Sequence, residues 1–380
     1  MKAHFRNLYL NKTTGITKCG YALIYLIMIG IFIVFVINQG IGINTTLFLL
    51  IGVMVVAYTL TYVRTQHPLA YYSLIIKLFP NRASAYHERA EVYRRRKEYR
   101  RALTDYDCAI QRRPGYARAY VDRARIYYEL REYHHCLKDY EQAHLLDTLD
   151  PQPYAERGAV YYQLKEYRVV IQDCTAALAL DPEYVWAYCY RSQAYNRLGE
   201  YELALRDSTH AIELDSTLAY AYGCRGQVYL RLSDLQQALA DFSKAWELDP
   251  TRLSYGWLIE WSKMCLPQPD TARAERLEAL AARDPTHHLA AVCRAVAHWL
   301  QENFEAAWRE LQQAPPPEPN DEAFSFWRGL ICISLERDDE ALAALEQALN
   351  LPPILLTPLR WIEHRRPDFY AQEVMPLLAR

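Results

Sequence analysis

Residues 185–218 read VWAYCYRSQAYNRLGEYELALRDSTHAIELDSTL, and related stretches of 34 residues begin at residues 83, 117, 151 and 219. Counted from these starts, place 4 and place 11 are Tyr in all five stretches, and place 27 is always Ala. Place 8 holds a small residue, which is Ala, Gly or Ser. A fixed period without insertions predicts an array of similar structural units.

Each stretch has the apolar pattern of two amphipathic helices. Places 4, 7, 8 and 11 fall within about one third of a helical turn, and places 20, 24 and 27 do the same further along. The small residues let two antiparallel helices approach each other, and the Tyr rings fill the space between successive hairpins. One hairpin cannot bury its own apolar face, so the hairpins must stack. We therefore predict an all-α solenoid.

These residues resemble the tetratricopeptide repeat (TPR) family over residues 83–252, in five regular repeats. Weaker repeats begin at His288 and Glu322, with a degenerate repeat near 254–287. The resemblance implies a right-handed superhelix of helical hairpins, whose inner groove binds other proteins. We also expect a half-repeat helix over 66–82, three divergent repeats over 253–355 and a capping helix over 356–380.

Arg stands at place 7 and Asp at place 23 in all five regular repeats. The turn between the two helices lies near places 15–16, so the two side chains stand level across the antiparallel pair. We predict an Arg–Asp salt bridge in each hairpin, which specifies register more than it adds stability. Its recurrence in every repeat argues against a catalytic role. The predicted pairs are Arg89 with Asp105, Arg123 with Asp139, Arg157 with Asp173, Arg191 with Asp207, and Arg225 with Asp241.

The composition argues against several classes of protein. The chain has 13 Gly and 31 Tyr among 380 residues. Gly is thus at about half of its average share of roughly 7%, which argues against a Rossmann domain, a P-loop or an all-β sandwich. The nine Cys are scattered singly, as expected for small buried residues in a reducing compartment. With no enzyme motif found, we expect no catalysis, cofactor, metal or small-molecule substrate.

The N-terminal region is basic and apolar. Residues 1–87 contain seven Lys or Arg and no Asp or Glu, whereas the remainder is acidic, which argues against a nucleic-acid-binding protein. Two apolar segments approach the roughly 17–25 residues of a membrane-spanning helix. We predict a basic lead over 1–18 and two transmembrane helices over 19–65, joined by an outside turn at 38–44. The flanking Lys and Arg predict a multi-pass protein of the cell membrane, with both termini and the TPR domain in the cytoplasm. The alternative is a cleaved signal peptide.

A candidate groove follows from places 2, 5, 9, 12 and 13 of the first helices, which point away from the Tyr stripe. Aromatic, Arg, Gln and Asn side chains at these places suit an extended peptide or a helix of a partner protein. Trp186 stands out among them, although packing against the neighbouring repeat explains it equally well. The Lys–Asn clamp by which some TPR co-chaperones hold a terminal carboxylate is absent, so that partner is not implied. The predicted groove comprises Arg125, Tyr128, Tyr162, Gln163, Trp186, Gln193, Asn196, Arg197, Tyr220, Gln227 and Arg231.

A second candidate surface is a basic cluster at the turn of the first repeat. One hypothesis is contact with anionic lipid headgroups, to which each basic residue adds about 1 kcal/mol near a membrane surface. The alternative is a solvated turn. The cluster comprises Arg94, Arg95, Arg96, Lys97, Arg100 and Arg101.

Together these features predict a membrane-anchored interaction scaffold, whose TPR groove recruits partner proteins. The alternative is an accessory or regulatory subunit of a membrane enzyme or transporter, contacted partly through the transmembrane helices. Replacing residues 1–65 with an unrelated hairpin distinguishes the two hypotheses, because only a simple tether retains its function.

Overall fold

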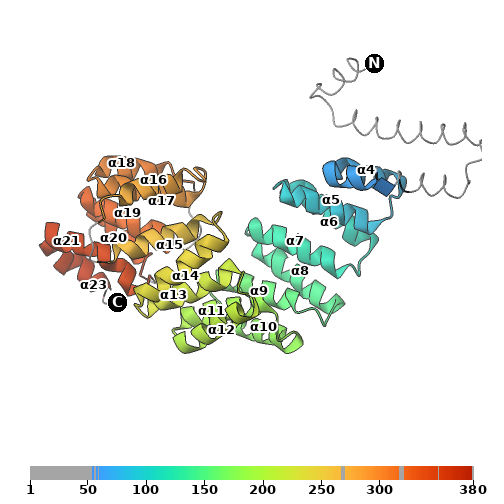
Figure 1. Cartoon of the computed structure of the whole chain (residues 1–380), viewed down its shortest axis with the longest axis horizontal. Coiled ribbons are helices and arrows are strands. Elements are labelled where there is room, and N and C mark those ends of the chain that lie inside the picture. The colour runs from blue at the N-terminus through green and yellow to red at the C-terminus, as the bar shows by residue number, and fades with distance from the viewer. Residues whose placement is uncertain are drawn as a thin grey trace, which may run out of the picture. The chain divides into compact units, whose positions relative to one another are not determined.

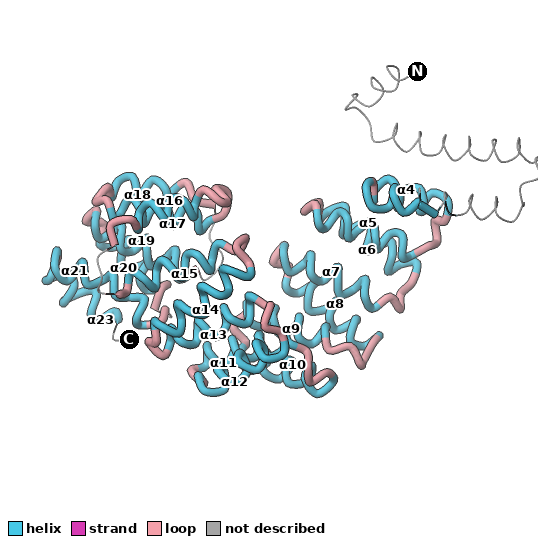
Figure 2. The backbone as a smooth tube through the Cα atoms, in the orientation of Figure 1, coloured by secondary structure: helices cyan, strands magenta, loops and turns pink. Residues whose placement is uncertain are grey.

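The computed structural model describes residues 54, 57–58, 60–266, 270–315, 321–349 and 351–378. Within these ranges the chain consists of helices and short loops, without any strand (Figure 2). It divides into an N-terminal unit that ends at Val160 and a C-terminal unit that begins at Tyr161. Each unit has buried apolar clusters of its own. The predicted all-α fold of stacked helical hairpins is confirmed.

The helices of the N-terminal unit follow the 34-residue frame. Helices α5 and α6 form one hairpin, α7 and α8 form the next, and neighbouring hairpins lie side by side (Figure 1). The boundary between the units falls within α9. These helices are α4 (Pro68–Leu78), α5 (Ala83–Arg95), α6 (Tyr99–Arg112), α7 (Ala117–Glu129), α8 (Tyr133–Leu146) and α9 (Gln152–Gln163).

The C-terminal unit continues the same alternation through the divergent repeats. The divergent second helices are shorter than those of the regular repeats. The helices are α10 (Tyr167–Leu180), α11 (Val185–Leu198), α12 (Tyr201–Leu214), α13 (Ala219–Arg231), α14 (Leu235–Leu248), α15 (Leu253–Met264), α16 (Arg273–Ala281), α17 (His288–Leu300), α18 (Phe304–Gln312), α19 (Glu322–Ser334) and α20 (Asp338–Glu346).

Apart from the hairpin of α15 and α16, the turn inside each hairpin has one residue in the left-handed region. In the fourth repeat this residue is Gly199, with φ of 81°. The amide of Glu200 then donates to the carbonyl of Tyr195 at 2.9 Å, which is the six-residue bond of a Schellman motif. The other repeats make the same bond with a side-chain-bearing residue at place 15. These residues are Lys97, Arg131, Lys165, Ser233, Glu302 and Glu336, with φ between 58° and 63°.

The turn between repeats is closed by Asp side chains. Asp215 Oδ1 accepts a hydrogen bond from the amide of Thr217 at 2.9 Å, and Asp249 accepts from Thr251 at 3.1 Å. Such Asx turns satisfy a backbone donor where one helix has ended and the next has not begun. The repeated Asp residues therefore help to determine where each first helix begins.

Helix contacts depend on the small residues at place 8. Ala90, Ala124 and Ser192 are completely buried. At Gly226, a Cβ atom would lie 2.8 Å from Cε1 of the buried Phe242. The second helix therefore packs directly on the backbone of the first, as the repeat pattern predicts.

The divergent repeats have a core of a different kind. Trp261 and Trp327 are almost completely buried, and their ring centroids lie 6.2 Å apart. Trp257 and Trp299 pack against Trp327 at 6.2 and 5.5 Å. Large aromatic rings thus fill a space that Tyr and Ala share in the regular repeats.

The C-terminal region, predicted as one capping helix over 356–380, consists of several short helical segments. The main break falls at Arg366, which adopts a non-helical conformation directly before Pro367. A residue before proline is sterically driven out of the helical region. The segments are η1 (Pro353–Leu359), α21 (Arg360–Arg365), α22 (Pro367–Phe369), η2 (Tyr370–Val374) and α23 (Met375–Leu378).

The predicted transmembrane helices over 19–65 lie almost entirely outside the described residues. In the part of the chain that the structure describes, no helix is both long enough and apolar enough to cross a membrane. The longest helices from α4 onward have 14 residues, whereas a span needs about 20 apolar ones. The prediction of a multi-pass membrane protein with cytoplasmic termini is therefore contradicted.

Candidate functional site

The Arg and Asp side chains of places 7 and 23 meet inside the hairpins. Arg89 donates to Asp105 through Nε and Nη2, both at 2.7 Å. The same paired geometry joins Arg123 to Asp139 at 2.7 Å, Arg191 to Asp207 at 2.6 and 3.0 Å, and Arg225 to Asp241 at 2.8 Å. Their Asp side chains are at most 7% exposed. Arg157 and Asp173 belong to different units.

The basic cluster of the first turn is divided between paired and free side chains. Arg94 binds Glu91 at 2.9 Å, and Arg101 binds Glu98 at 2.7 Å. The other four residues are exposed and make no ion pair within the described residues; they are Arg95, Arg96, Lys97 and Arg100. Contact with lipid headgroups stays a prediction.

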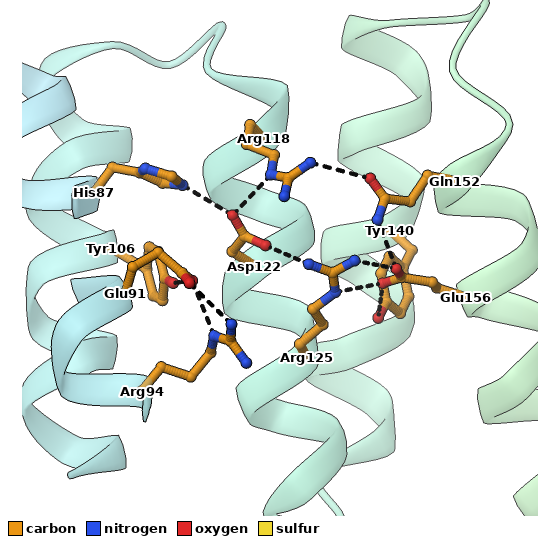
Figure 3. A network of polar contacts seen from close by, with 10 residues as sticks. All are labelled: His87, Glu91, Arg94, Tyr106, Arg118, Asp122, Arg125, Tyr140, Gln152 and Glu156. Carbon is orange, nitrogen blue, oxygen red and sulfur yellow. Dashed lines mark hydrogen bonds and ion pairs between the residues drawn. The ribbon is translucent and has the colours of Figure 1, made fainter. Parts of the chain in front are cut away.

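A network of polar contacts covers the first helices of the N-terminal unit (Figure 3). His87 Nε2 lies 2.9 Å from Asp122 Oδ2, and Arg118 Nε donates to the same oxygen at 3.0 Å. Arg125 Nη1 donates to Asp122 Oδ1 at 2.7 Å, and its Nε donates to Glu156 Oε2 at 2.9 Å. Arg125, predicted as a groove residue, is thus already bound to two carboxylates of its own unit.

The electrostatics of this network centre on Asp122, which is 1% exposed. Burial raises the pKa of the Asp122 carboxyl. The hydrogen bond from His87 and the charges of Arg118 and Arg125 outweigh burial, so the pKa lies below its ordinary value. The network therefore keeps Asp122 ionised and neutralised.

The C-terminal unit contains a groove of about 620 Å³, which the first helices of its repeats line together with residues 251–255 and the start of α19. Eight of the eleven predicted groove residues line it: Tyr162, Gln163, Gln193, Asn196, Arg197, Tyr220, Gln227 and Arg231. Tyr128 belongs to the N-terminal unit, like Arg125. The remaining predicted residue, Trp186, lies outside the lining.

Trp186 packs against aromatic neighbours of its own unit. Its ring centroid lies 5.4 Å from that of Tyr220 and 6.1 Å from that of Tyr190. The side chain remains 41% exposed. Packing against the neighbouring repeat therefore explains Trp186. The exposed part of its ring remains accessible to solvent.

The groove brings together residues that are distant in the sequence. Arg197 Nε donates to the Tyr162 hydroxyl at 3.0 Å, and its Nη1 binds Glu322 Oε1 at 3.0 Å across 125 positions. Burial lowers the pKa of Arg197, but Tyr162 and Glu322 together raise it by more than burial lowers it. The guanidinium therefore stays charged. Tyr220 Oη donates to Gln193 Oε1 at 3.0 Å, and burial raises the pKa of this tyrosine.

Sequence reasoning missed the groove residues supplied by turns and divergent repeats. Lys165 comes from a hairpin turn, Arg252 and Tyr255 from the start of α15, and Asp321 and Glu322 from the start of α19. Only the degenerate TPR spacing pointed to these segments, and it did not indicate which side of the helices would face inward. Among the described residues, no group of three or more His, Cys, Asp or Glu side chains is arranged to hold a metal ion.

Comparison with known proteins identifies the repeats. Models of the tetratricopeptide repeat match residues 87–143, 219–252 and 324–354. No curated protein matches the chain.

Several solved structures resemble the fold. A TPR protein from Parabacteroides merdae is 16% identical, covering 63% of this chain and 97% of its own, with a TM-score of 0.44. A thermophilic TPR protein from Thermus thermophilus is 19% identical, with coverages of 48% and 99% and a TM-score of 0.44. YrrB, described as a TPR protein with an unusual peptide-binding site, is 20% identical, with coverages of 49% and 96% and a TM-score of 0.37.

The family models indicate no catalytic function, and TPR domains bind protein partners. The model matches coincide with the 34-residue spacing and with the helical hairpins of the structure. Residues 87–143, 219–252 and 324–354 therefore match tetratricopeptide repeats, and the described part of the chain has the all-α fold of a TPR solenoid.

Proposed function

We propose that the protein is an interaction scaffold, whose groove in the C-terminal unit binds a peptide segment or a helix of a partner protein. The observation that carries this proposal is the convergence of eight side chains, each at an inward place of the repeat, on one groove. Its volume of about 620 Å³ falls within the roughly 300–1,000 Å³ of sites that enclose small ligands. A short part of a partner chain would fill it.

The lining suits a peptide chemically. Tyr162 and Tyr220, which are partly exposed, offer ring faces for apolar side chains, and their hydroxyl groups are polar. Gln163 and Gln227 carry both a donor and an acceptor, as required to pair with main-chain amides. Aromatic rings beside amides and guanidinium groups are typical of surfaces that bind proteins.

Recruitment to a membrane is not part of this proposal. The rival hypothesis, a subunit that contacts a membrane enzyme through its own spans, also depends on residues 19–65, and no observation in the described residues favours it.

The proposal is tested by site-specific photo-crosslinking in cells. A photoreactive amino acid replaces Gln193 or Gln227 in the groove, and in the control it replaces Arg206, which is exposed and does not line the groove. We expect the same partner protein to be captured from both groove positions but not from position 206. Capture from position 206 alone, or equally from all three positions, would contradict a groove-binding scaffold.

A further inference from the structure

The groove of the C-terminal unit has an excess of positive charge. Four cationic side chains line it, Lys165, Arg197, Arg231 and Arg252, and two acidic ones do, Asp321 and Glu322. With His neutral, the lining therefore has a net charge of +2, from four positive and two negative groups. The whole chain has a net charge of −2. The excess is therefore local, and it selects for a ligand of opposite charge.

Both acidic groups of the lining already have partners. Glu322 binds Arg197 at 3.0 Å, and the two side chains are 13% and 27% exposed. Asp321 accepts from the amide of Phe324 at the start of α19 and lies 3.0 Å from His288 Nε2. Neither carboxylate forms an ion pair with Lys165, Arg231 or Arg252 within the described residues.

Arg231 has the fewest polar contacts among the three arginines of the groove. It makes no ion pair or hydrogen bond within the described residues, although it is only partly exposed. Burial lowers the pKa of its guanidinium and the charge of Arg197 lowers it further, and the charge of Glu322, which raises the pKa, does not outweigh them. A partly buried charge without a partner is destabilising, and a carboxylate placed beside it removes that cost.

Arg252 and Lys165 also lack carboxylate partners within the described residues. Arg252 Nη1 donates to the Tyr255 hydroxyl at 3.2 Å, and its guanidinium lies 5.4 Å from the ring centroid of Tyr220. Neither contact is an ion pair, although the hydrogen bond to Tyr255 and the charge of Asp249 raise the pKa of this guanidinium against the effect of burial. Lys165 is exposed at the rim and makes no ion pair in the described part of the chain.

In the N-terminal unit, the arginines at inward places of the first helices form ion pairs. Arg94, Arg118 and Arg125 each bind a carboxylate of the same unit, as Figure 3 shows. These three arginines of the N-terminal unit are thus all paired with carboxylates, whereas among the inward arginines of the C-terminal unit Arg197 is paired and Arg231 is not. Within the described residues no ion pair neutralises Arg231 or Arg252, so a bound ligand can supply carboxylates to both.

Three buried polar atoms of the groove lining lack hydrogen-bond partners among the described residues: Asn196 Oδ1, Trp257 Nε1 and Asp321 Oδ2, the last of which lies 3.0 Å from His288 Nε2. Asn196 is 7% exposed and its Oδ1 makes no hydrogen bond, while Trp257 is 2% exposed and its Nε1–H makes none. Both residues line the groove. An acceptor and a donor that are buried without partners match the amide and carbonyl groups of an extended peptide.

We propose that the groove binds an acidic, extended segment of a partner protein, whose carboxylates pair with Arg231 and Arg252. The inference rests on the function proposed above and specifies its ligand. The ion pair between Arg197 and Glu322 is an example, within the chain, of how an arginine of the groove binds a carboxylate. A partner segment with Asp or Glu side chains continues the same pairing along the groove.

Phage selection from a random short-peptide library against the full-length chain tests this proposal. We expect the selected peptides to be enriched in Asp and Glu. A synthetic copy of the best peptide should bind about tenfold more weakly to Arg231→Gln or Arg252→Gln, and about as weakly when its own Glu and Asp are changed to Gln and Asn. Arg206→Gln, which replaces an exposed arginine outside the groove, is the matched control and should leave binding unchanged.

Weaker binding by a variant can result from misfolding, so a variant that should bind the peptide more strongly is also needed. Glu322→Gln releases Arg197 and should increase the affinity for the acidic peptide, which a folding defect does not do. Unchanged or weaker binding by this variant would contradict the role given to Arg197.

The outcomes separate this inference from the proposed function. Peptides that crosslink to position 227 without acidic enrichment would overturn the inference and leave the peptide-binding scaffold intact. Peptides that crosslink only outside the groove, or no selected peptides at all, would overturn both. Stronger binding of a single-stranded oligonucleotide than of the acidic peptide would also overturn the inference.

Discussion

Two glycines in turns supply a matched pair of substitutions: Gly199 lies in the turn inside a hairpin, and Gly115 lies in the turn between two repeats. Gly199 has φ of 81°, whereas Gly115 lies outside the left-handed region, and a Cβ added at either position would meet no atom within 4 Å. The two positions therefore differ in backbone conformation but not in the space available to the Cβ atom of Ala. We predict that Gly199→Ala destabilises the protein and that Gly115→Ala stabilises it.

The magnitudes follow from two opposing effects. A side-chain-bearing residue in the left-handed region costs about 1–2 kcal/mol. Replacing Gly by Ala also restricts the unfolded chain, which stabilises the folded state by about 0.4–1 kcal/mol. Gly199→Ala should therefore lower the free energy of unfolding by about 0.5–1.5 kcal/mol, and Gly115→Ala should raise it by about 0.4–1 kcal/mol.

The converse change applies to the other turns. Ser233 has φ of 61° at the same place of the next repeat. Ser233→Gly removes the cost of the left-handed conformation but makes the unfolded chain more flexible, so we expect the free energy of unfolding to rise by about 0.5–1.5 kcal/mol.

Urea unfolding followed by far-ultraviolet circular dichroism measures these changes as shifts of the midpoint. Hydrogen exchange of the amides in α11 and α12 adds a local measure, because a repeat array need not unfold in one step. If Gly199→Ala and Gly115→Ala shift the midpoint in the same direction, or if Ser233→Gly destabilises the chain, the reasoning from backbone conformation is wrong.

Three further predictions concern packing and charge. Arg225→Met leaves the buried Asp241 without its partner and should lower the free energy of unfolding by about 3–5 kcal/mol, whereas Arg225→Met combined with Asp241→Leu should cost much less, as urea midpoints would show. Gly226→Ala forces its Cβ against Phe242, so a loss of about 1–3 kcal/mol is expected in the same assay, and an unchanged midpoint would contradict the close helix approach. Because the pKa of Asp122 lies below its ordinary value, its ionised form adds stability above about pH 4 that is lost as the pH falls through the lowered pKa. The stability difference between wild type and Asp122→Asn should therefore narrow on acidification, and a constant difference from pH 6 to the acid transition would refute this assignment.

Much of the fold could be predicted because each repeat follows from local spacing. Tyr at place 4, a small residue at place 8 and Ala at place 27 specify two helix faces, and each face packs only on its neighbours in the sequence. The same regularity placed Arg225 opposite Asp241, since both stand at equal distances from the hairpin turn. The left-handed residue at place 15 was not predicted, because Lys97, Arg131 and Glu302 disfavour that conformation and only the Schellman bond requires it.

The groove was predictable only in its regular half. Tyr162, Gln193 and Gln227 follow from inward places of the repeat, whereas Arg252 and Glu322 come from segments whose spacing has degenerated. Trp186 was chosen from its place alone, and its ring lies against Tyr220.

The sequence by itself determined the repeat length, the helical hairpins and the Arg–Asp spacing, because these depend on residues within one or two repeats. The tertiary structure alone decided which charges are neutralised. Arg125 pairs with Glu156 in the adjacent repeat, and Arg197 pairs with Glu322 across 125 positions, but Arg231 forms no ion pair in the described residues. Pairing over such distances depends on how successive hairpins are rotated relative to one another within a unit, and small rotations add up along the stack. The accumulated rotation cannot be predicted from a local pattern of residues.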